Sequence, residues 1–431
     1  MEKLFHLNQH GTTVRREVMA GLTTFLTMAY ILAVNPGMLG MIGNGMTAGA
    51  VFTATALASA IATLVMAFTA NLPVALAPGM GLNAFFTFTV VFGMGYSWQL
   101  ALTAVFLEGI VFIFLSLVNV REAIINAIPG NLKKAVAVGI GLFIALIGFS
   151  NAGIVVNDGG TVIGLGNLSQ PHPFLALVGL VLIIVLYSTK VPGAILIGIL
   201  VTTLIGLPVG VTTFPEGWSP FGMPAAPLLF QFDFSSVLTF KFFTVFFTFF
   251  FVDIFDTVGT LVGVTTQAGL TDKKGNIPHV KQALLADAVG TMAGAALGTS
   301  TVTSYIESAA GVAAGGRTGL TSLTTAILFL LALILSPLFL LIPGAATAPA
   351  LIFVGFLMMK PVSGIDFEDP TEGIPAFLTI VMMPFAYSIA EGIVYGILSY
   401  VLLKAATLRF KEIPIITWVL FVVFVLRYFL Q

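Results

Sequence analysis

The residues best placed to do chemistry in this 431-residue chain are acids inside apolar stretches. Glu307 stands in the run Gly298–Gly311, which begins with small and hydroxyl residues. Thr301–Thr303 favour an extended backbone because branching at Cβ crowds a helix, whereas the residues after Ser304, a reasonable N-cap, can form a helix. At membrane depth, such an interruption beside an acid is typical of a substrate or ion site.

A second interruption has the same plan. The run Pro73–Phe86 is predicted to be extended at first, and its Pro and Gly residues, among them Gly81, mark a break before an apolar helix. Asn83 and Glu307 are 224 positions apart, and the starts of two apolar spans repeat at the same offset. Paired interruptions at matching places in two halves indicate a transporter site.

A pair of aspartates forms the third candidate feature. Asp253 and Asp256 are three positions apart, so on a helix they share one face. Two such close charges cannot both ionise cheaply, which predicts a shared proton or cation. The alternative is a structural polar seam between packed helices.

Six acids fall within apolar spans, and no Lys or Arg lies in the middle of a span; the acids are Glu108, Asp253, Asp256, Asp287, Glu307 and Glu391. A carboxyl without a cationic partner in a desolvated site tends to hold a proton, as a proton-coupled device requires. For Glu108, Asp287 and Glu391, simple hydrogen bonding within the protein is the competing interpretation.

The donors and acceptors in the two breaks favour a particular ligand chemistry. Asn83 can both donate and accept hydrogen bonds, as can any protonated carboxyl. This set suits a planar heterocycle with adjacent N–H and C=O groups. An anion site would need Lys, Arg or bare helix N-termini instead.

The composition indicates an integral, polytopic membrane protein. Hydrophobic residues make up 58% of the chain and charged residues 8%, with a mean hydropathy of +1.08, whereas a soluble domain has about a quarter charged residues. The 17 basic and 18 acidic residues are nearly balanced, which argues against nucleic acid as a partner. The chain contains no cysteine, so disulfides and thiol chemistry are excluded.

The hydrophobic runs divide into two sets of seven expected spans. The first set is 17–40, 48–70, 75–95, 98–119, 134–150, 172–188 and 191–211. The second set is 240–266, 283–297, 300–316, 318–341, 345–360, 374–387 and 389–404, followed by an extra apolar run at 413–430. Residues 374–404 could form one kinked helix or a hairpin turning near Tyr387, and we favour the hairpin because it places Lys404 on the basic side.

The Lys and Arg residues orient these spans. They cluster before span 1, after span 4, between spans 6 and 7, and after span 8, whereas the loops 151–171 and 212–238 contain none. The positive-inside rule then predicts a cytoplasmic N-terminus and places those two loops outside. Because seven is odd, the second half is inverted relative to the first.

Four motifs resemble the nucleobase–cation symporter family that includes the uracil permeases, specifically its adenine–guanine–hypoxanthine permease branch. They occur in the order found in that family and are Thr13–Ile31, Ala77–Phe86, Val252–Thr260 and Thr301–Gly311. The resemblance implies an all-α fold of about fourteen helices in two inverted repeats of seven, with extended breaks in spans 3 and 10. It also implies a core domain, residues 1–120 and 239–341, that moves against a gate domain, residues 121–238 and 342–431.

The resemblance also implies a site between the two breaks, facing span 8. The family's pattern maps base contacts onto Asn83, onto Asp253 or Asp256, and onto Glu307. Asp256 aligns best with the span 8 acid of the uracil permeases. To the expected base-binding residues we add three from the breaks, Gly81, Thr303 and Ser304. Asp253, Asp256 and Glu307 are the expected proton-coupling residues.

The leading hypothesis is therefore a multi-pass carrier in the cell membrane that couples purine nucleobase uptake to protons by alternating access. Sodium remains open as the coupling ion, and a homodimer is a further expectation; no cofactor, metal or catalytic residue is expected. A carrier of an anion such as sulfate or bicarbonate with the same architecture is the alternative. An intramembrane aspartyl protease is a distant one, because Asp253 and Asp256 share one helix.

Overall fold

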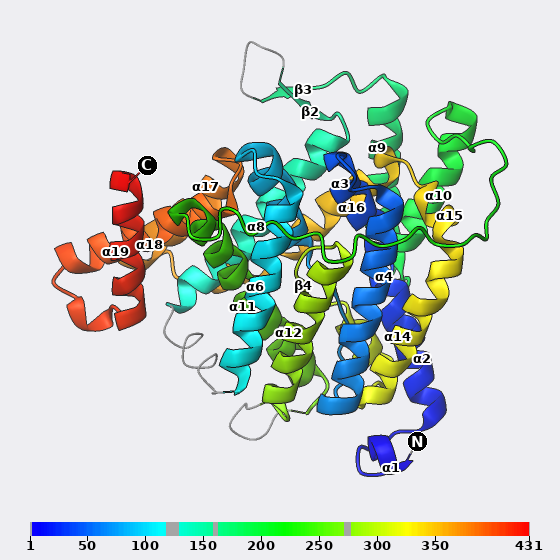
Figure 1. The fold of residues 1–431 in the computed structure, drawn as a ribbon, viewed down its shortest axis with the longest axis horizontal. Coiled ribbons are helices and arrows are strands. Elements are labelled where there is room, and N and C mark those ends of the chain that lie inside the picture. Colours follow the sequence, from blue (N-terminus) through cyan, green and yellow to red (C-terminus); the bar gives the residue numbers. More distant parts are fainter. Residues whose placement is uncertain (1, 118–128, 158–162, 271–276, 431) are drawn as a thin grey trace.

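The computed structural model describes residues 2–117, 129–157, 163–270 and 277–430. Helices make up most of the described part, joined by two short pairs of antiparallel strands (Figure 1). Arg121, Lys273 and Lys274, which contributed to the predicted orientation, lie outside the described residues.

The elements of the first half follow the expected spans closely. They are α1 (Glu2–Phe5), α2 (Val14–Met28), α3 (Ile31–Leu39), α4 (Ala48–Val65), β1 (Leu76–Pro78), α5 (Met80–Ala84), α6 (Trp98–Leu117), α8 (Gly130–Asn151), β2 (Val155–Val156), β3 (Gly164–Leu165), α9 (Pro171–Ser188) and α10 (Ala194–Val209). Helix α4 continues as a π-helix over Met66–Ala70, and α5 continues as one over Phe85–Gly93.

The long helices of the second half follow the same order as those of the first half, and β4 takes the place of β1. Its elements are α11 (Phe240–Gln267), α12 (Val280–Leu297), β4 (Val302–Ser304), α13 (Ser308–Ala313), α14 (Gly319–Ala332), α15 (Ser336–Leu340), α16 (Gly344–Leu357), α17 (Pro370–Phe385), α18 (Ile389–Ala406) and α19 (Ile415–Leu430). Several helices begin at a hydroxyl residue that accepts a backbone N–H and so satisfies one of the free donors of the first turn. These N-caps are Thr13, Thr47, Thr239, Thr318 and Ser388.

Besides α1 and α19, the described elements form fourteen apolar segments, in agreement with the predicted fold class. Within the described residues, eight helices are long and apolar enough to cross a membrane by length and composition. The apolar helices over Met80–Gly93 and Ala194–Val209 are shorter. The protein is thus a multi-pass membrane protein, as the composition predicted.

The helices pack in two groups. In one, α4 packs against α3, α12 and α14, while α2 packs against α13 and α14, and α6 against α11 and α12. In the other, α8 packs against α16 and α17, while α9 packs against α10 and α16, and α17 against α18. The first group holds both broken segments, which are spans 3 and 10 of the sequence.

The C-terminal part contains the hairpin that the sequence favoured. Helices α17 and α18 are separated by Ala386–Ser388 and pack against each other, with Tyr387 in a left-handed conformation at φ 51°. Helix α19 packs against α18 at one edge of the molecule (Figure 1). The buried Lys404 ties this end together, because its Nζ lies 2.8 Å from Glu372 and 2.6 Å from Glu412.

Candidate functional site

The two broken segments meet as a two-stranded antiparallel ladder. Strand β1 pairs with β4, with Leu76 opposite Ser304 and Pro78 opposite Val302. The ladder extends at both ends, because the Tyr305 N–H donates to the Ala75 carbonyl at 2.9 Å and the Gly79 N–H donates to the Thr301 carbonyl at 3.0 Å. The predicted extended breaks are therefore confirmed, and each supplies backbone partners for the other.

Hydroxyl side chains satisfy the outer edges of this ladder. The Leu76 N–H donates to Thr63 Oγ1 at 3.0 Å, and the Ala75 N–H donates to Ser308 Oγ at 3.0 Å. On the other strand, Thr291 Oγ1 donates to the Val302 carbonyl at 2.9 Å. An irregular backbone can exist at membrane depth only with such partners, which explains the hydroxyl residues around the breaks.

Glu307 lies immediately before α13 and is half-buried. Its Oε1 accepts a hydrogen bond of 2.6 Å from the Tyr30 hydroxyl. The predicted N-cap at Ser304 is wrong, because the ladder holds Ser304 in β4 and a turn at Tyr305 precedes the helix. Gly311 lies within α13 and allows this helix to approach α2 closely, because a Cβ there would clash with Thr24 Oγ1.

A cavity of about 1280 Å³ lies between the two helix groups, and Glu307 lines it. Residues of α2 and α13 form one wall, and residues of α9, α10 and α16 form the other. Lys190 and Lys360 also line it, beyond the ends of α9 and α16, and both are exposed. The other lining side chains are mostly aliphatic or aromatic. Among the described residues that line the cavity, Glu307 is the acidic one.

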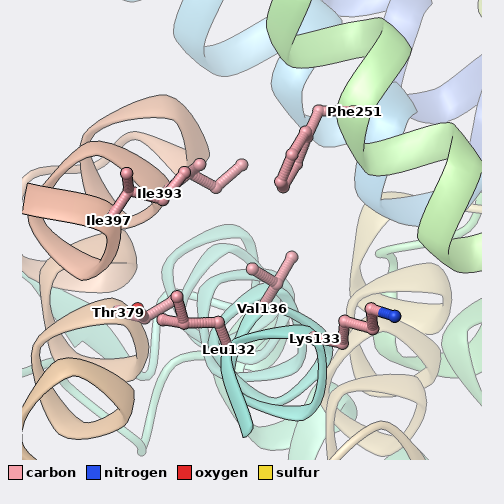
Figure 2. Close-up of a pocket in the computed structure, with 7 residues that line it drawn as sticks. All are labelled: Leu132, Lys133, Val136, Phe251, Thr379, Ile393 and Ile397. Atoms are coloured by element: carbon pink, nitrogen blue, oxygen red, sulfur yellow. The ribbon is translucent and has the colours of Figure 1, made fainter. Parts of the chain in front are cut away.

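A second cavity, of about 10 Å³, lies between α11 of the first group and α8, α17 and α18 of the second. Figure 2 shows Phe251 pointing from α11 toward side chains of α8 and α18, while Lys133 directs its amine away. A space of this size holds about one water molecule. It can therefore not accept an organic substrate, and it marks a packing gap at the contact between the groups.

The two aspartates of α11 have different partners, although they share one helix. Asp256 is half-buried, and its Oδ2 accepts a 3.3 Å hydrogen bond from Thr303 of β4. Asp253 is buried, and its Oδ1 lies 3.2 Å from Thr257 Oγ1. That hydroxyl lies only 2.5 Å from Oδ1 of Asp287 on α12. Asp256 therefore belongs to the ladder, and Asp253 belongs to the contact between α11 and α12.

Asn83 is buried and bonded within the protein. Its Oδ1 accepts a hydrogen bond from Ser300, and its Nδ2 donates to the Pro78 carbonyl at 3.4 Å. The register places Asn83 beyond the Pro78 end of the ladder and Glu307 beyond the Ser304 end. The two residues occupy matching places in the two halves, yet the antiparallel pairing puts them at opposite ends of the ladder.

The other predicted site residues, Thr303, Ser304 and Gly81, do not all face the same side of the ladder. Thr303 points to Asp256, so Ser304, the next residue of the strand, points to the opposite face with Val302, which packs against α12. Gly81 of α5 faces α8, where a Cβ would come 2.6 Å from Ile140 Cγ2. Gly81 thus forms a close contact between the two helix groups.

Two further acids, Glu108, which the sequence analysis named, and Glu17, which it did not, bond to hydroxyl groups within the protein. Glu108 Oε2 accepts a 2.8 Å hydrogen bond from Thr301, which secures α6 to the start of β4. Glu17, which the sequence analysis did not single out, is buried in α2. It accepts bonds from Thr318 and Thr321 and from the Arg317 N–H at the start of α14. Its place in the first turn of α2 gave no signal, because the partners lie some 300 residues away.

Comparison with known proteins agrees with this architecture. The chain is 43% identical to the adenine permease AdeP of Escherichia coli over 432 residues, which covers 99% of this chain and 95% of that protein. It is 45% identical to the guanine/hypoxanthine permease PbuO of Bacillus subtilis over 438 residues, which covers 99% of both. These are permeases, so the prediction of a transporter rather than an intramembrane protease is confirmed.

Among solved structures, the transmembrane domain of the cyanobacterial bicarbonate transporter BicA has a TM-score of 0.64. The structural match covers 89% of this chain and 97% of the BicA domain at 16% sequence identity. A match at this identity shows that the two proteins share a fold and nothing more. The permease family Xan_ur_permease matches residues 15–395. The chain therefore belongs to the uracil/xanthine permease family.

Proposed function

We propose that this protein carries purine nucleobases across the cell membrane by alternating access, with its N-terminus in the cytoplasm. The observation that carries the proposal is Glu307, which lies next to the paired breaks and lines the large cavity between the two helix groups. Two relatives that align over nearly the whole chain are named for adenine and for guanine/hypoxanthine. A heterocycle with ring N–H groups matches the acceptors that the site offers.

In this proposal, the first helix group is the core domain, residues 1–120 and 239–341. The second group is the gate domain, residues 121–238 and 342–431. The packing supports this division, because both broken segments and α11 belong to one group. An elevator-like motion of the core against the gate then changes the side to which the site is open. We propose that the cavity lined by Lys190 and Lys360 provides access from the cytoplasm, the side on which the positive-inside rule places basic residues.

The base is proposed to bind on the side of the ladder that carries Thr303. Asp256 and Glu307 accept N–H groups of the base, and Thr303 orients Asp256 through its hydroxyl. In the protonated form either acid also donates to a ring nitrogen or carbonyl of the base. Asn83 and Gly81 support this site by fixing α5, since one bonds to Ser300 and the other contacts Ile140.

We assign proton coupling to Asp253, Asp256 and Glu307. The geometry around Thr257 supports a role for Asp253, because one hydroxyl lies within hydrogen-bond distance of two carboxyl groups. A hydroxyl has a single proton to donate. If both contacts are hydrogen bonds, one of Asp253 and Asp287 must itself carry a proton.

The test uses purified protein in liposomes, with radiolabelled adenine, guanine and hypoxanthine in separate uptake assays. Uptake of at least one base is expected to rise as external pH falls and to collapse with a protonophore. Replacement of the pH gradient by a sodium gradient decides between the two coupling ions. Uptake of sulfate or bicarbonate with no uptake of any base would refute the proposal in favour of an anion carrier.

A further inference from the structure

A tyrosine outside the predicted set contacts the central acid of the site. The Tyr30 hydroxyl donates to Glu307 Oε1 at 2.6 Å, and Tyr30 is only 1% exposed. The sequence analysis did not single out this residue, although it lies within the first family-like motif. The contact joins residues 277 positions apart.

Tyr30 lies at a tight turn of the backbone between two helices. Helix α2 ends at Met28 and α3 begins at Ile31, so span 1 is interrupted at this point. The Ala33 N–H donates to the Tyr30 carbonyl at 3.0 Å, and the Leu32 N–H to the Ala29 carbonyl at 3.1 Å. These are i→i+3 bonds, and a tightened turn inside a long helix often marks a functional position.

The repeat of the two halves gives Tyr30 a meaningful place. The 224-residue offset that relates the breaks carries Tyr30 to Ile254, between Asp253 and Asp256. Span 8 brings Asp256 to the ladder through Thr303, which pairs with Ala77 in the middle of the ladder. Span 1 brings the Tyr30 hydroxyl to Glu307, which lies beyond the Ser304 end of the ladder. Corresponding segments of the two halves thus each provide one side chain beside the ladder.

We propose that Tyr30 is a positioning residue for the base: its hydroxyl holds Oε1 of Glu307, so that Oε2 is the oxygen presented to the ligand. This inference rests on the proposed function. It deepens that function by assigning the orientation of Glu307 to span 1. A carboxylate with one oxygen held by the protein accepts a single N–H in a fixed direction, so Tyr30 also contributes to discrimination among bases.

The bond should affect binding rather than movement. Tyr30 lies between α2 and α3, and Glu307 immediately precedes α13, which packs against α2 in the same helix group. The pair therefore moves together when the two groups move relative to each other. Removal of the hydroxyl should weaken binding to a similar extent from either side of the membrane and leave the maximal transport rate largely intact.

The experiment measures equilibrium binding of radiolabelled base to purified full-length protein, and KM and Vmax in liposomes. Tyr30→Phe is expected to weaken binding and raise KM by about tenfold, the lower end for a hydrogen bond to a charged group, with Vmax within about twofold of wild type. In a Glu307→Asp background, whose shorter side chain withdraws from Tyr30, the same substitution should add almost nothing.

Tyr305→Phe is the matched control, since the Tyr305 hydroxyl also donates at 2.6 Å, but to the Pro78 carbonyl. Its effect should be equal in the wild-type and Glu307→Asp backgrounds. Wild-type affinity in Tyr30→Phe, or an equal loss in both backgrounds, would overturn the inference while wild-type binding still upholds the proposed function. Absence of base binding by the wild type would refute the proposed function and this inference with it.

Discussion

Gly81 offers the sharpest test of motion between the two helix groups. It lies in α5, and a Cβ placed there would come 2.6 Å from Cγ2 of Ile140 on α8, in the other group. Ile140 cannot avoid this contact easily, because Cγ2 is attached directly to Cβ and the branched side chain is stiff at χ1. The Gly81→Ala substitution therefore overpacks the contact between the groups. It leaves the helix itself unharmed, because Ala favours a helix more than Gly does.

The expected magnitude follows from the overlap. Overpacking of a tight contact costs about 1–3 kcal/mol. Gly81 and Ile140 belong to different helix groups. The clash therefore raises the free energy of the conformation described here, and it is absent from any conformation in which the two groups have moved apart at this contact. The equilibrium between arrangements then shifts by roughly 5- to 150-fold. Transport by Gly81→Ala should slow by a comparable factor, whereas the amount of folded protein stays near that of the wild type.

The assay compares uptake in liposomes for Gly81→Ala, Ile140→Ala and the double variant. Truncation of Ile140 removes the clashing methyl group, so the double variant should recover most of the activity lost in Gly81→Ala. Gly130→Ala is the control, because Gly130 is the first residue of α8 and has no atom within 4 Å of its would-be Cβ. Equal activity of Gly81→Ala and wild type, or no recovery in the double variant, would refute the reasoning.

Three further outcomes are expected. Glu307→Gln should reduce base affinity about 10- to 150-fold while the protein still reaches the membrane, as measured by binding and by surface labelling, because it removes a charged acceptor; normal uptake would contradict the site. At least one of the variants Asp253→Asn and Asp256→Asn should be a carrier that exchanges bases but does not concentrate them. Accumulation of base against a gradient by both variants would exclude this pair from coupling. Lys404→Met should lower the free energy of unfolding in detergent by about 2 kcal/mol. This loss is smaller than the loss on breaking a fully buried ion pair, because Glu412 is 51% exposed. An unchanged melting temperature would contradict this prediction.

The sequence predicted the backbone of the site because its determinants are local. Proline and glycine around Pro78 interrupt span 3, and the β-branched residues Thr301–Thr303 extend span 10. Each signal acts within a few residues and requires no knowledge of the partner segment. The hairpin at Tyr387 follows from charge placement, because Lys404 lies with the other basic residues only if the chain turns back.

The partners of the side chains could not be predicted in this way. Asp253 and Asp256 share a helix face by spacing, yet Asp253 contacts Thr257, which also bonds to Asp287, whereas Asp256 contacts Thr303. Asp287 and Thr303 lie on α12 and β4, whose positions relative to α11 depend on tertiary packing. The interruption of span 1 at Tyr30 has only a weak local signal, since the nearest Pro or Gly is Pro36, six positions later.

The hydroxyl partners of the acids provide a physical link between this architecture and coupling. Tyr30 bonds to Glu307, Thr303 to Asp256, Thr301 to Glu108, and Thr257 to Asp287. A hydroxyl donates to a carboxylate, and after rotation it accepts from the protonated acid. Lys and Arg have no acceptor, so an ion pair breaks when its acid takes up a proton. Each hydroxyl-bonded acid can therefore gain or lose a proton and still keep its partner. Lys404, by contrast, is a cation in ion pairs, and it lies away from the ladder, where it fixes the end of α18 to Glu372 and Glu412.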